Sequence, residues 1–158
     1  MFEQTIYNYD AQQNDRLIEI FYTAVHHIDS NTYTTEQKRA WAPYPIDYAF
    51  WYDRLSTKQP WMAWFNNKLV GFIELDNDGY IDCLYVDPQY QGQGIATSLY
   101  NKVITIAQQK RLSKLYVHAS YIARPVFLHW GFRCIQRNEV RRKEQVLVNF
   151  TMEKCLAL

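Results

Sequence analysis

A strand-loop-helix segment over residues 85–97 carries residue types that can hold a phosphate group. Its residues are Tyr-Val-Asp-Pro-Gln-Tyr-Gln-Gly-Gln-Gly-Ile-Ala-Thr, so an apolar run ends, two glycines follow, and a helical pattern begins. Gly92 and Gly94 allow the backbone to turn tightly and to bring several N–H groups toward one point. The N-terminus of the following helix adds roughly half a positive charge. The segment therefore predicts a binding site for a phosphate or pyrophosphate.

Two other phosphate-binding motifs do not fit this segment. A Walker A loop needs a Gly-Lys dipeptide, and the sequence contains none. The dinucleotide fingerprint G-x-G-x-x-G/A has Thr97 where its third small residue belongs, and it requires parallel strands where this sequence predicts hairpins. A plain tight turn at Gly92 and Gly94 is the simplest alternative to a binding site.

Three helices are predicted in the N-terminal third. An apolar stripe from Leu17 to Ile28 at helical spacing predicts a helix that begins at Asn14. Thr34 and Gln37 form a capping-box pattern that opens the second helix. A proline opens the third, which covers residues 45–55.

Short apolar runs predict the strands. Turn sequences at 66–68 and 77–79 separate three of these runs, which is typical of an antiparallel meander. The whole order is strand, three helices, three strands, helix, strand, helix and two strands, which predicts a mixed α/β (α+β) fold. The predicted strands cover residues 2–7, 61–65, 69–76, 80–86, 114–119, 132–140 and 146–154, and the two later helices cover 95–110 and 122–130.

Composition and charge limit the classes of function. The chain has 158 residues, of which 48% are apolar, and this predicts one packed domain over residues 1–158. Seventeen Lys and Arg residues oppose sixteen Asp and Glu residues, for a net charge of +1. Without a basic excess, nucleic acids and anionic membrane surfaces are poor partners, and a small ligand is favoured.

Cysteine, histidine and leader patterns add further expectations. The three cysteines are odd in number and form no C-x-x-C pair, which argues against a disulfide framework and a zinc ribbon. The four histidines show no i, i+4 or H-E-x-x-H pairing, so no metal site is expected. Neither a secretory leader pattern nor an apolar run of about 18 residues occurs, which predicts a soluble cytoplasmic protein.

The glycine segment resembles a family motif. The run Gln91-Gly92-Gln93-Gly94-Ile95-Ala96 is similar to the Q/R-x-x-G-x-G/A motif of the GNAT N-acetyltransferase superfamily. A second similarity covers residues 119–132, which look like the fifth strand of that family and the helix that ends in a Gly-Phe pair. The strand at 82–86, the step Ala123-Arg124-Pro125 and residues 149–154 look most like the YafP-like branch. The resemblance covers residues 60–155 well and the N-terminal third loosely.

The resemblance implies a fold and a cosubstrate. It implies a central, mostly antiparallel sheet that splays between its fourth and fifth strands, with helices on both faces. It also implies acetyl-CoA as the acetyl donor, with the diphosphate on the glycine segment and the pantetheine arm along the fourth strand. The residues that it implies for coenzyme binding are Leu84, Tyr85, Val86, Gln91, Gly92, Gln93, Gly94, Ile95, Ala96, Thr97, Ser120 and Phe127.

Acid and base chemistry needs further residues. An amine must lose a proton before it attacks a thioester, because a lysine-like amine is mostly protonated at pH 7. Asp82 is the favoured proton acceptor, ahead of Glu74, although both also fit carboxylates in ordinary salt bridges. In a regular strand Asp82 and Leu84 point to one face and Tyr85 to the other, unless a bulge intervenes. His118 is expected to be a hydrogen-bonded structural histidine, with a base as the alternative.

The proton donor to the leaving thiolate is less defined. Members of the family often use a Tyr four residues before the Gly-Phe pair, and that position holds Phe127 here. Tyr121, Tyr85, Ser120 and water are the candidates that remain, and the thiolate can also leave without a donor. Cys83 is expected to be a buried, unreactive thiol.

The resemblance and the residues together predict an N-acetyltransferase that transfers acetyl from acetyl-CoA to a primary amine by direct attack in a ternary complex. Aromatic residues in the first half, together with Asp47 and Asp53, favour a small amine over a protein acceptor. A homodimer is compatible with this prediction. The alternatives are a non-catalytic acetyl-CoA-binding regulator, which Phe127 favours, and a nucleotide-binding protein.

Overall fold

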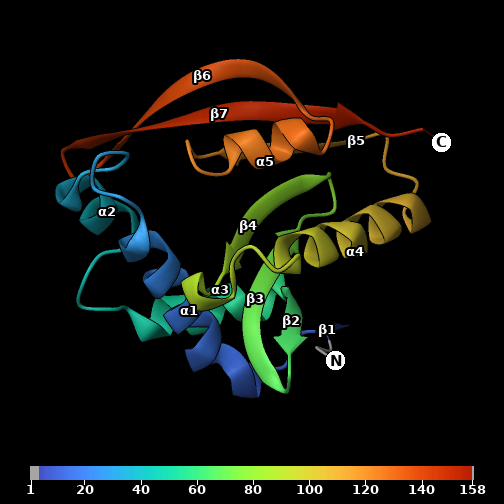
Figure 1. The fold of residues 1–158 in the computed structure, drawn as a ribbon, viewed down its shortest axis with the longest axis horizontal. Coiled ribbons are helices and arrows are strands. Elements are labelled where there is room, and N and C mark those ends of the chain that lie inside the picture. The colour runs from blue at the N-terminus through green and yellow to red at the C-terminus, as the bar shows by residue number, and fades with distance from the viewer. Residues whose placement is uncertain (1–3, 158) are drawn as a thin grey trace.

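Seven strands form one sheet in the computed structural model, which describes residues 4–157 (Figure 1). The strands are β1 (Gln4–Tyr7), β2 (Trp61–Phe65), β3 (Lys68–Leu75), β4 (Tyr80–Val86), β5 (Lys114–Ala119), β6 (Arg133–Arg142) and β7 (Gln145–Cys155). Their order across the sheet is β1-β2-β3-β4-β5-β7-β6, and only β4 and β5 pair in parallel. Residues 2 and 3 of the first predicted strand lie outside the described residues.

Five helices and two short 3₁₀ turns complete the described part of the chain. They are η1 (Ala11–Gln13), α1 (Asn14–His27), α2 (Thr35–Trp41), α3 (Tyr48–Lys58), η2 (Pro88–Tyr90), α4 (Ile95–Gln109) and α5 (Arg124–His129). The predicted capping box is present, since Thr34 Oγ1 accepts the Gln37 N–H and the Gln37 side chain accepts the Thr34 N–H. The order of helices and strands confirms the predicted mixed α/β fold.

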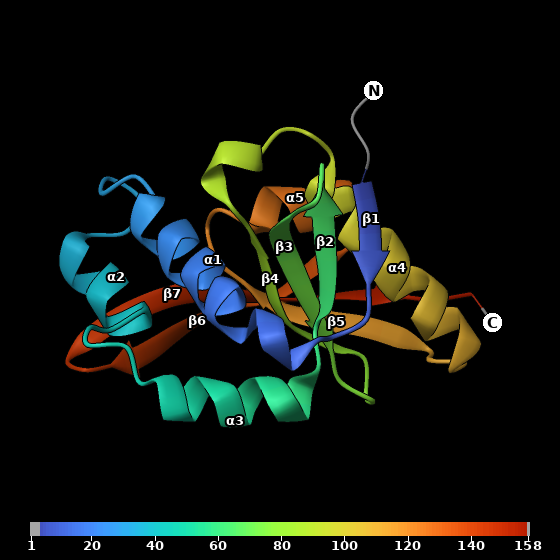
Figure 2. The same cartoon turned by 90° about the horizontal axis from the view of Figure 1, so that it is seen from below.

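Two apolar cores place helices on both faces of the sheet. On one face, α1 and α3 contribute Phe21 and Leu55 to a core that includes Phe72 of β3. On the other face, α4 contributes Leu99 and Val103. Figure 2 shows α1 to α3 on one side of β2 and β3 and α4 on the other. Among residues 4–157, no helix combines the length and the apolar character that a membrane crossing requires.

The sheet splays between β4 and β5, as predicted. The two strands pair only at Tyr80 with Tyr116 and at Ile81 with Val117, and then they separate. Beyond that point β5 stays paired with β7 and β4 stays paired with β3, so each strand follows its own outer neighbour. The main-chain groups of β4 that face β5 past Ile81 therefore have no strand partner in the described structure. We call the region where the strands separate the splay.

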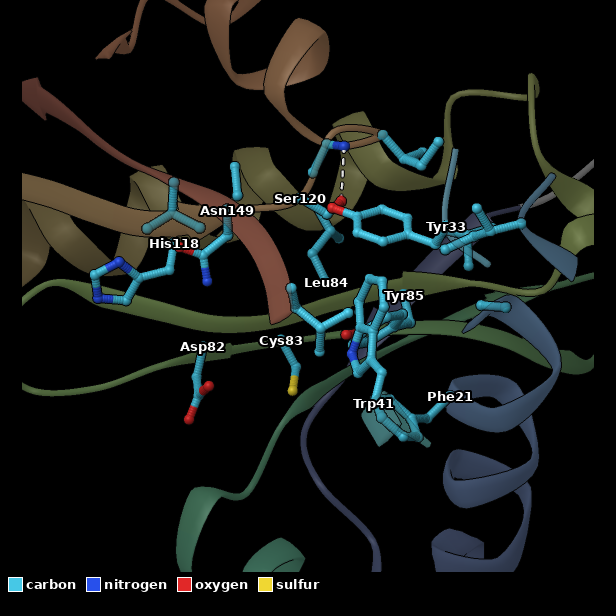
Figure 3. Close-up of a pocket in the computed structure, with 18 of the residues that line it drawn as sticks. Phe21, Tyr33, Trp41, Asp82, Cys83, Leu84, Tyr85, His118, Ser120 and Asn149 are labelled. Atoms are coloured by element: carbon cyan, nitrogen blue, oxygen red, sulfur yellow. Dashed lines mark hydrogen bonds between the residues drawn. The ribbon is translucent and has the colours of Figure 1, made fainter. Parts of the chain in front are cut away.

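A bulge in β4 overturns the predicted orientation of Asp82. Ile73 pairs with Leu84 and Leu75 with Ile81, so three steps along β4 oppose two along β3. The extra residue puts Asp82 on the same side of the strand as Cys83, and Arg54 Nη2 contacts both side chains. Figure 3 shows both side chains directed to that side of β4. Asp82 therefore does not share the face of Leu84.

Candidate active site

The glycine loop, residues 91–97, presents a row of free backbone donors at the start of α4. Gly92 and Gly94 adopt left-handed φ values of 78° and 80°, which residues other than glycine rarely adopt. Gly94 caps the helix without a side-chain hydrogen bond. Within residues 4–157, the six N–H groups of residues 92–97 have no hydrogen-bond acceptor. The loop thus combines unpaired donors with the positive end of a 15-residue helix, which is a suitable geometry for an anion.

Contacts from the N-terminal half hold this loop. Asp87 accepts an ion-paired hydrogen bond from Arg16 at 2.7 Å, and its other oxygen accepts the Gln89 N–H at 3.0 Å. Burial by itself raises the pKa of Asp87, but the bonds from Arg16 and Gln89 outweigh it and lower that pKa. Gln4 donates to the Gln93 carbonyl oxygen at 2.7 Å. The loop is therefore positioned by α1 and β1 as well as by its glycines.

A cleft of about 2510 Å³ joins the glycine loop to the splay. It is lined by eleven of the twelve residues expected to bind coenzyme, and Gln93 is the exception. The eleven are Leu84, Tyr85, Val86, Gln91, Gly92, Gly94, Ile95, Ala96, Thr97, Ser120 and Phe127. The structure thus brings the loop, β4 and the end of β5 around one open space.

A partly buried ion-pair network lies beside the splay. Arg54 of α3 lies 2.5 Å from Glu74 Oε1 and 2.9 Å from Asp82 Oδ2. Lys58 lies 2.8 Å from Asp82 and 2.9 Å from Asp76. With every group ionised, three carboxylates and two cations leave one net negative charge. Asp82 lines the cleft, but both of its neighbouring cations contact it directly.

Glu74 lies outside the cleft. Its side chain is fully buried, Oε2 has no hydrogen-bond partner, and the residue is not among those that line the open space. Burial raises the pKa of Glu74, and the hydrogen bond from Arg54 opposes that rise only in part. Of the two predicted proton acceptors, only Asp82 is in contact with the cleft.

The predicted proton donors lie in different places. Tyr85 lines the cleft and packs against Phe21 and Phe72, with ring centroids 4.9 and 5.9 Å away. Burial raises the pKa of Tyr85 well above its ordinary value. Tyr121 is not among the lining residues and packs edge-on against Phe150 at 5.4 Å. Only Tyr85 of these two phenols is in contact with the cleft.

Ser120, Phe127 and Cys83 also line the cleft. Ser120 Oγ accepts the Ala123 N–H at 3.1 Å in a turn that delays α5 to Arg124, two residues later than predicted. Phe127 is buried and brings no hydroxyl to this wall. Cys83 is buried as predicted, and burial raises the pKa of its thiol well above the ordinary value.

Aromatic side chains form the wall of the cleft on the side of α1 and α3. Ring contacts run from Tyr44 through Tyr22 and Trp51 to Phe21, and then to Tyr85 on β4. Tyr44 is exposed at the outer end of this series, and its three neighbours toward β4 are buried. The aromatic wall therefore leads from solvent to the splay.

Of the two aspartates predicted to attract an amine, only one lines the cleft. Asp47 lines the cleft, but its Oδ1 accepts the Phe50 N–H and caps α3. Asp53 is exposed and is not a lining residue. No group of three or more His, Cys, Asp or Glu in the described part of the chain is arranged to hold a metal ion.

Tyr33 is a site residue that no sequence pattern indicated. Its side chain is buried, its hydroxyl donates to the Val148 carbonyl oxygen at 2.9 Å, and it accepts the Tyr121 N–H at 2.9 Å (Figure 3). Gln37 donates to the Val146 carbonyl oxygen at 2.9 Å. These bonds tie the α1–α2 region to β7, and Figure 1 shows the β6–β7 hairpin reaching α2. The hairpin thus closes one end of the cleft.

Replacing Tyr33 by phenylalanine is expected to lower the free energy of unfolding by about 1–3 kcal/mol, because the part-buried Val148 carbonyl and Tyr121 N–H both lose their partner. Urea unfolding measures the change. Tyr116→Phe is the matched control, since the Tyr116 hydroxyl bonds to the exposed Asp78, and a smaller loss is expected there. Equal losses of unfolding free energy in the two variants would show that the hydrogen bonds of Tyr33 do not stabilise the contact with β7.

Comparisons with known proteins agree with this geometry. The family model described as acetyltransferase (GNAT) domain matches residues 29–154. The chain is 36% identical over 147 residues to the uncharacterized N-acetyltransferase YafP of Escherichia coli (strain K12), and the match covers 93% of each chain.

Solved structures share the fold. The GCN5-related N-acetyltransferase from Rhodopseudomonas palustris superposes with a TM-score of 0.91 and 31% identity, covering 96% of this chain and 95% of that one. YncA from Salmonella typhimurium, whose structure contains its cofactor acetyl-CoA, superposes with a TM-score of 0.73 and 17% identity. That match covers 98% of this chain and 94% of YncA, and at this identity it supports the fold alone.

Proposed function

Because the chain belongs to the GNAT acetyltransferase family, we propose that it transfers the acetyl group of acetyl-CoA to a primary amine by direct attack in a ternary complex. The row of unpaired N–H groups at residues 92–97 is the observation that carries this proposal. A diphosphate offers the acceptor oxygens that those donors lack. The presence of acetyl-CoA in the structure of YncA, a protein of the same fold, supports the choice of ligand.

The splay would take the pantetheine arm and the thioester. Past Ile81, β4 has main-chain groups without a strand partner, so an extended arm can pair with them as an added strand does. A backbone N–H near Leu84 or Tyr85 then stabilises the charge that develops on the thioester oxygen. Such a donor contributes about 3 kcal/mol in comparable sites.

The acceptor would be a small amine rather than a protein segment. Tyr33 and Gln37 tie the α1–α2 region to β7, so an extended polypeptide has no open channel at that end. The aromatic wall suits a compact amine with an apolar part. The net negative charge of the network around Asp82 favours an ammonium group over a carboxylate.

A screen of primary amines with acetyl-CoA, in which the released thiol is measured, tests the proposed function. We expect thiol release that depends on both substrates, and a mass increase of one acetyl group on the amine. Small alkyl and arylalkyl amines should react, whereas peptides with free N-termini or lysines should not.

A non-catalytic acetyl-CoA-binding module is the second candidate, and the buried Phe127 at the place of the usual tyrosine favours it. It predicts thermal stabilisation by acetyl-CoA together with no thiol release across the whole panel. A nucleotide-binding protein would instead be stabilised by ATP or NAD and not by acetyl-CoA.

Asp82 is proposed to attract and orient the ammonium group of the acceptor. Replacing Asp82 by asparagine should lower kcat/KM for the amine about fivefold, in keeping with the loss of roughly 1 kcal/mol of charge attraction. The dissociation constant of acetyl-CoA should not change. In this variant Arg54 retains its ion pair with Glu74, and Lys58 retains its ion pair with Asp76, so both cations stay paired.

Asp53→Asn is the control for Asp82→Asn, because Asp53 lies exposed on α3, away from the cleft. Steady-state rates with varied amine measure both variants. A rate for Asp82→Asn that equals that of Asp53→Asn would remove Asp82 from the proposed site.

A further inference from the structure

His118 lies just past the point where β4 and β5 separate. Val117 makes the last pair of β5 with β4, so His118 is the first residue of β5 inside the splay. It lines the cleft and is exposed, whereas Val117 and Ala119 on either side are buried in a core. Figure 3 shows His118 next to Asn149, with the Asp82 side chain directed away from both. The imidazole is thus available to a molecule in the splay.

One ring nitrogen of His118 is held by the protein and the other is free. Nδ1 lies 3.1 Å from Thr151 Oγ1. Asn138 Nδ2 donates to the same hydroxyl at 2.8 Å and to Asn149 Oδ1 at 3.0 Å. These bonds fix the position of the Thr151 hydroxyl. The Tyr80 ring packs against the imidazole, with centroids 5.4 Å apart. Among the described residues Nε2 has no hydrogen-bond partner, and in the tautomer that donates from Nδ1 it carries a lone pair.

The carboxylate of Asp82 is less suited than the imidazole of His118 to accept the proton of the amine. Arg54 and Lys58 contact its carboxylate at 2.9 and 2.8 Å, and their positive charges oppose protonation of that group. Glu74 is buried outside the cleft. Asp47 already accepts the N–H that caps α3. No cation contacts His118 in the described structure, and a histidine changes its charge between pH 5 and 8.

We infer that His118, through Nε2, is the group that takes the proton from the acceptor amine. This inference rests on the proposed function. Nε2 removes one proton from the ammonium group and releases it to solvent. The neutral nitrogen forms the N–C bond with the thioester carbonyl carbon as the C–S bond breaks and its electron pair leaves on sulfur. The nitrogen then gives its surplus proton, through water, to the thiolate, so the products are the acetamide, the free thiol and one proton.

The polar, charged and titratable groups near His118 belong to five elements, β4 to β7 and α3. Its own strand carries Tyr116, and β4 carries Tyr80 and Asp82. Burial raises the pKa of Tyr80 to about 12, so this phenol stays neutral over the working range. The partners on β7 and β6, Thr151, Asn149 and Asn138, do not titrate. Arg54 and Lys58 of α3 are bound to carboxylates. A difference in pH profile between the wild type and the His118 variants is therefore attributed to this imidazole.

The test compares the wild type with His118→Gln and His118→Ala, using an amine that the thiol-release screen has identified. At pH 7 we expect kcat/KM for the amine to fall about 100-fold in both variants, the usual contribution of a general base. The pH profile of the wild-type rate should differ from that of both variants, whose rates should keep rising with pH because they need the amine to be neutral before it binds. Added imidazole should restore part of the rate of His118→Ala and leave His118→Gln unchanged. The dissociation constant of acetyl-CoA should be the same in all three proteins.

His27→Gln is the matched control, because His27 also lines the cleft but lies on α1, outside the splay, and its replacement should keep both the rate and its pH profile. A wild-type enzyme that acetylates the amine, with a His118→Gln variant that keeps its rate and pH profile, would overturn the inference alone. A wild-type protein that binds acetyl-CoA and acetylates no amine would instead overturn the proposed function.

Discussion

Replacing Gly94 by tryptophan should abolish acetyl-CoA binding and leave the fold intact. Gly94 has a φ of 80° and lines the cleft at the start of α4. A Cβ built there meets only Gln4 Nε2, at 3.9 Å, so a side chain has room without a clash against the core. That room is the space in front of the free N–H row, and an indole would fill it. We expect the dissociation constant of acetyl-CoA to rise at least about 100-fold, or about 2.7 kcal/mol.

Calorimetry and thermal stabilisation by acetyl-CoA measure this effect. Gly94→Ala is the control, since it has the same unfavourable φ but adds only a methyl group to open space. It should lose much less affinity than the tryptophan variant. Equal losses in both variants would assign the effect to backbone strain, and unchanged binding by Gly94→Trp would place the coenzyme elsewhere.

Replacing Arg54 by methionine should cost about 3–5 kcal/mol of stability at pH 8, because it leaves the Glu74 carboxylate buried without its cation. The Glu74 side chain is fully buried, and within residues 4–157 Arg54 is its only ion-pair partner. Arg54 also contacts Asp82, but Lys58 stays bound to that carboxylate. The loss should therefore come mainly from Glu74.

The loss should depend on pH in a defined direction. Burial raises the pKa of Glu74 above its ordinary value of 4.5, so the folded protein holds this proton more tightly than the unfolded chain does. The resulting stability is fully present below 4.5 and is lost as pH rises through the folded pKa. Without Arg54, which opposes the rise, the folded pKa is higher still. Arg54→Met should thus be less destabilising at pH 5 than at pH 8.

Urea unfolding at the two pH values measures the change, and the double variant Arg54→Met, Glu74→Gln is the control. The neutral amide removes the buried charge, so the double variant should recover most of the lost stability and show little pH dependence. A double variant as unstable as Arg54→Met would mean that Arg54 acts through Asp82 or through packing on Trp51, whose ring lies 5.6 Å from its guanidinium.

The glycine loop and the order of elements were predicted correctly because their signals are local. Gly92 and Gly94 are the residues that the left-handed backbone of the loop requires. Thr34 and Gln37 are three residues apart, so their capping box depends on one helical turn. The splay was implied by family resemblance, and the pairing of β4 with β5 agrees with it. For the glycine loop and the capping box, a few neighbouring residues carry the information.

The orientation of Asp82 could not be predicted in this way. Its sequence neighbours alternate as in a regular strand, and the bulge arises from the register of β4 against β3. That register depends on which side chains of both strands enter the two cores. The ion pair of Arg54 with the buried Glu74 likewise joins residues of α3 and β3 that are distant in sequence. Thr151 of β7 binds Nδ1 of His118, and this contact leaves Nε2 as the free nitrogen.

The sequence by itself determined the strand-loop-helix segment with its two glycines, the order of the elements and the net charge. These features follow from backbone preferences and composition, which act over a few residues or over the whole chain. Only the tertiary structure decided that Arg54 holds Asp82, that Tyr33 ties β7 to the cleft, and that His118 faces the splay. Such contacts depend on burial and register between segments distant in sequence, and no local pattern encodes them.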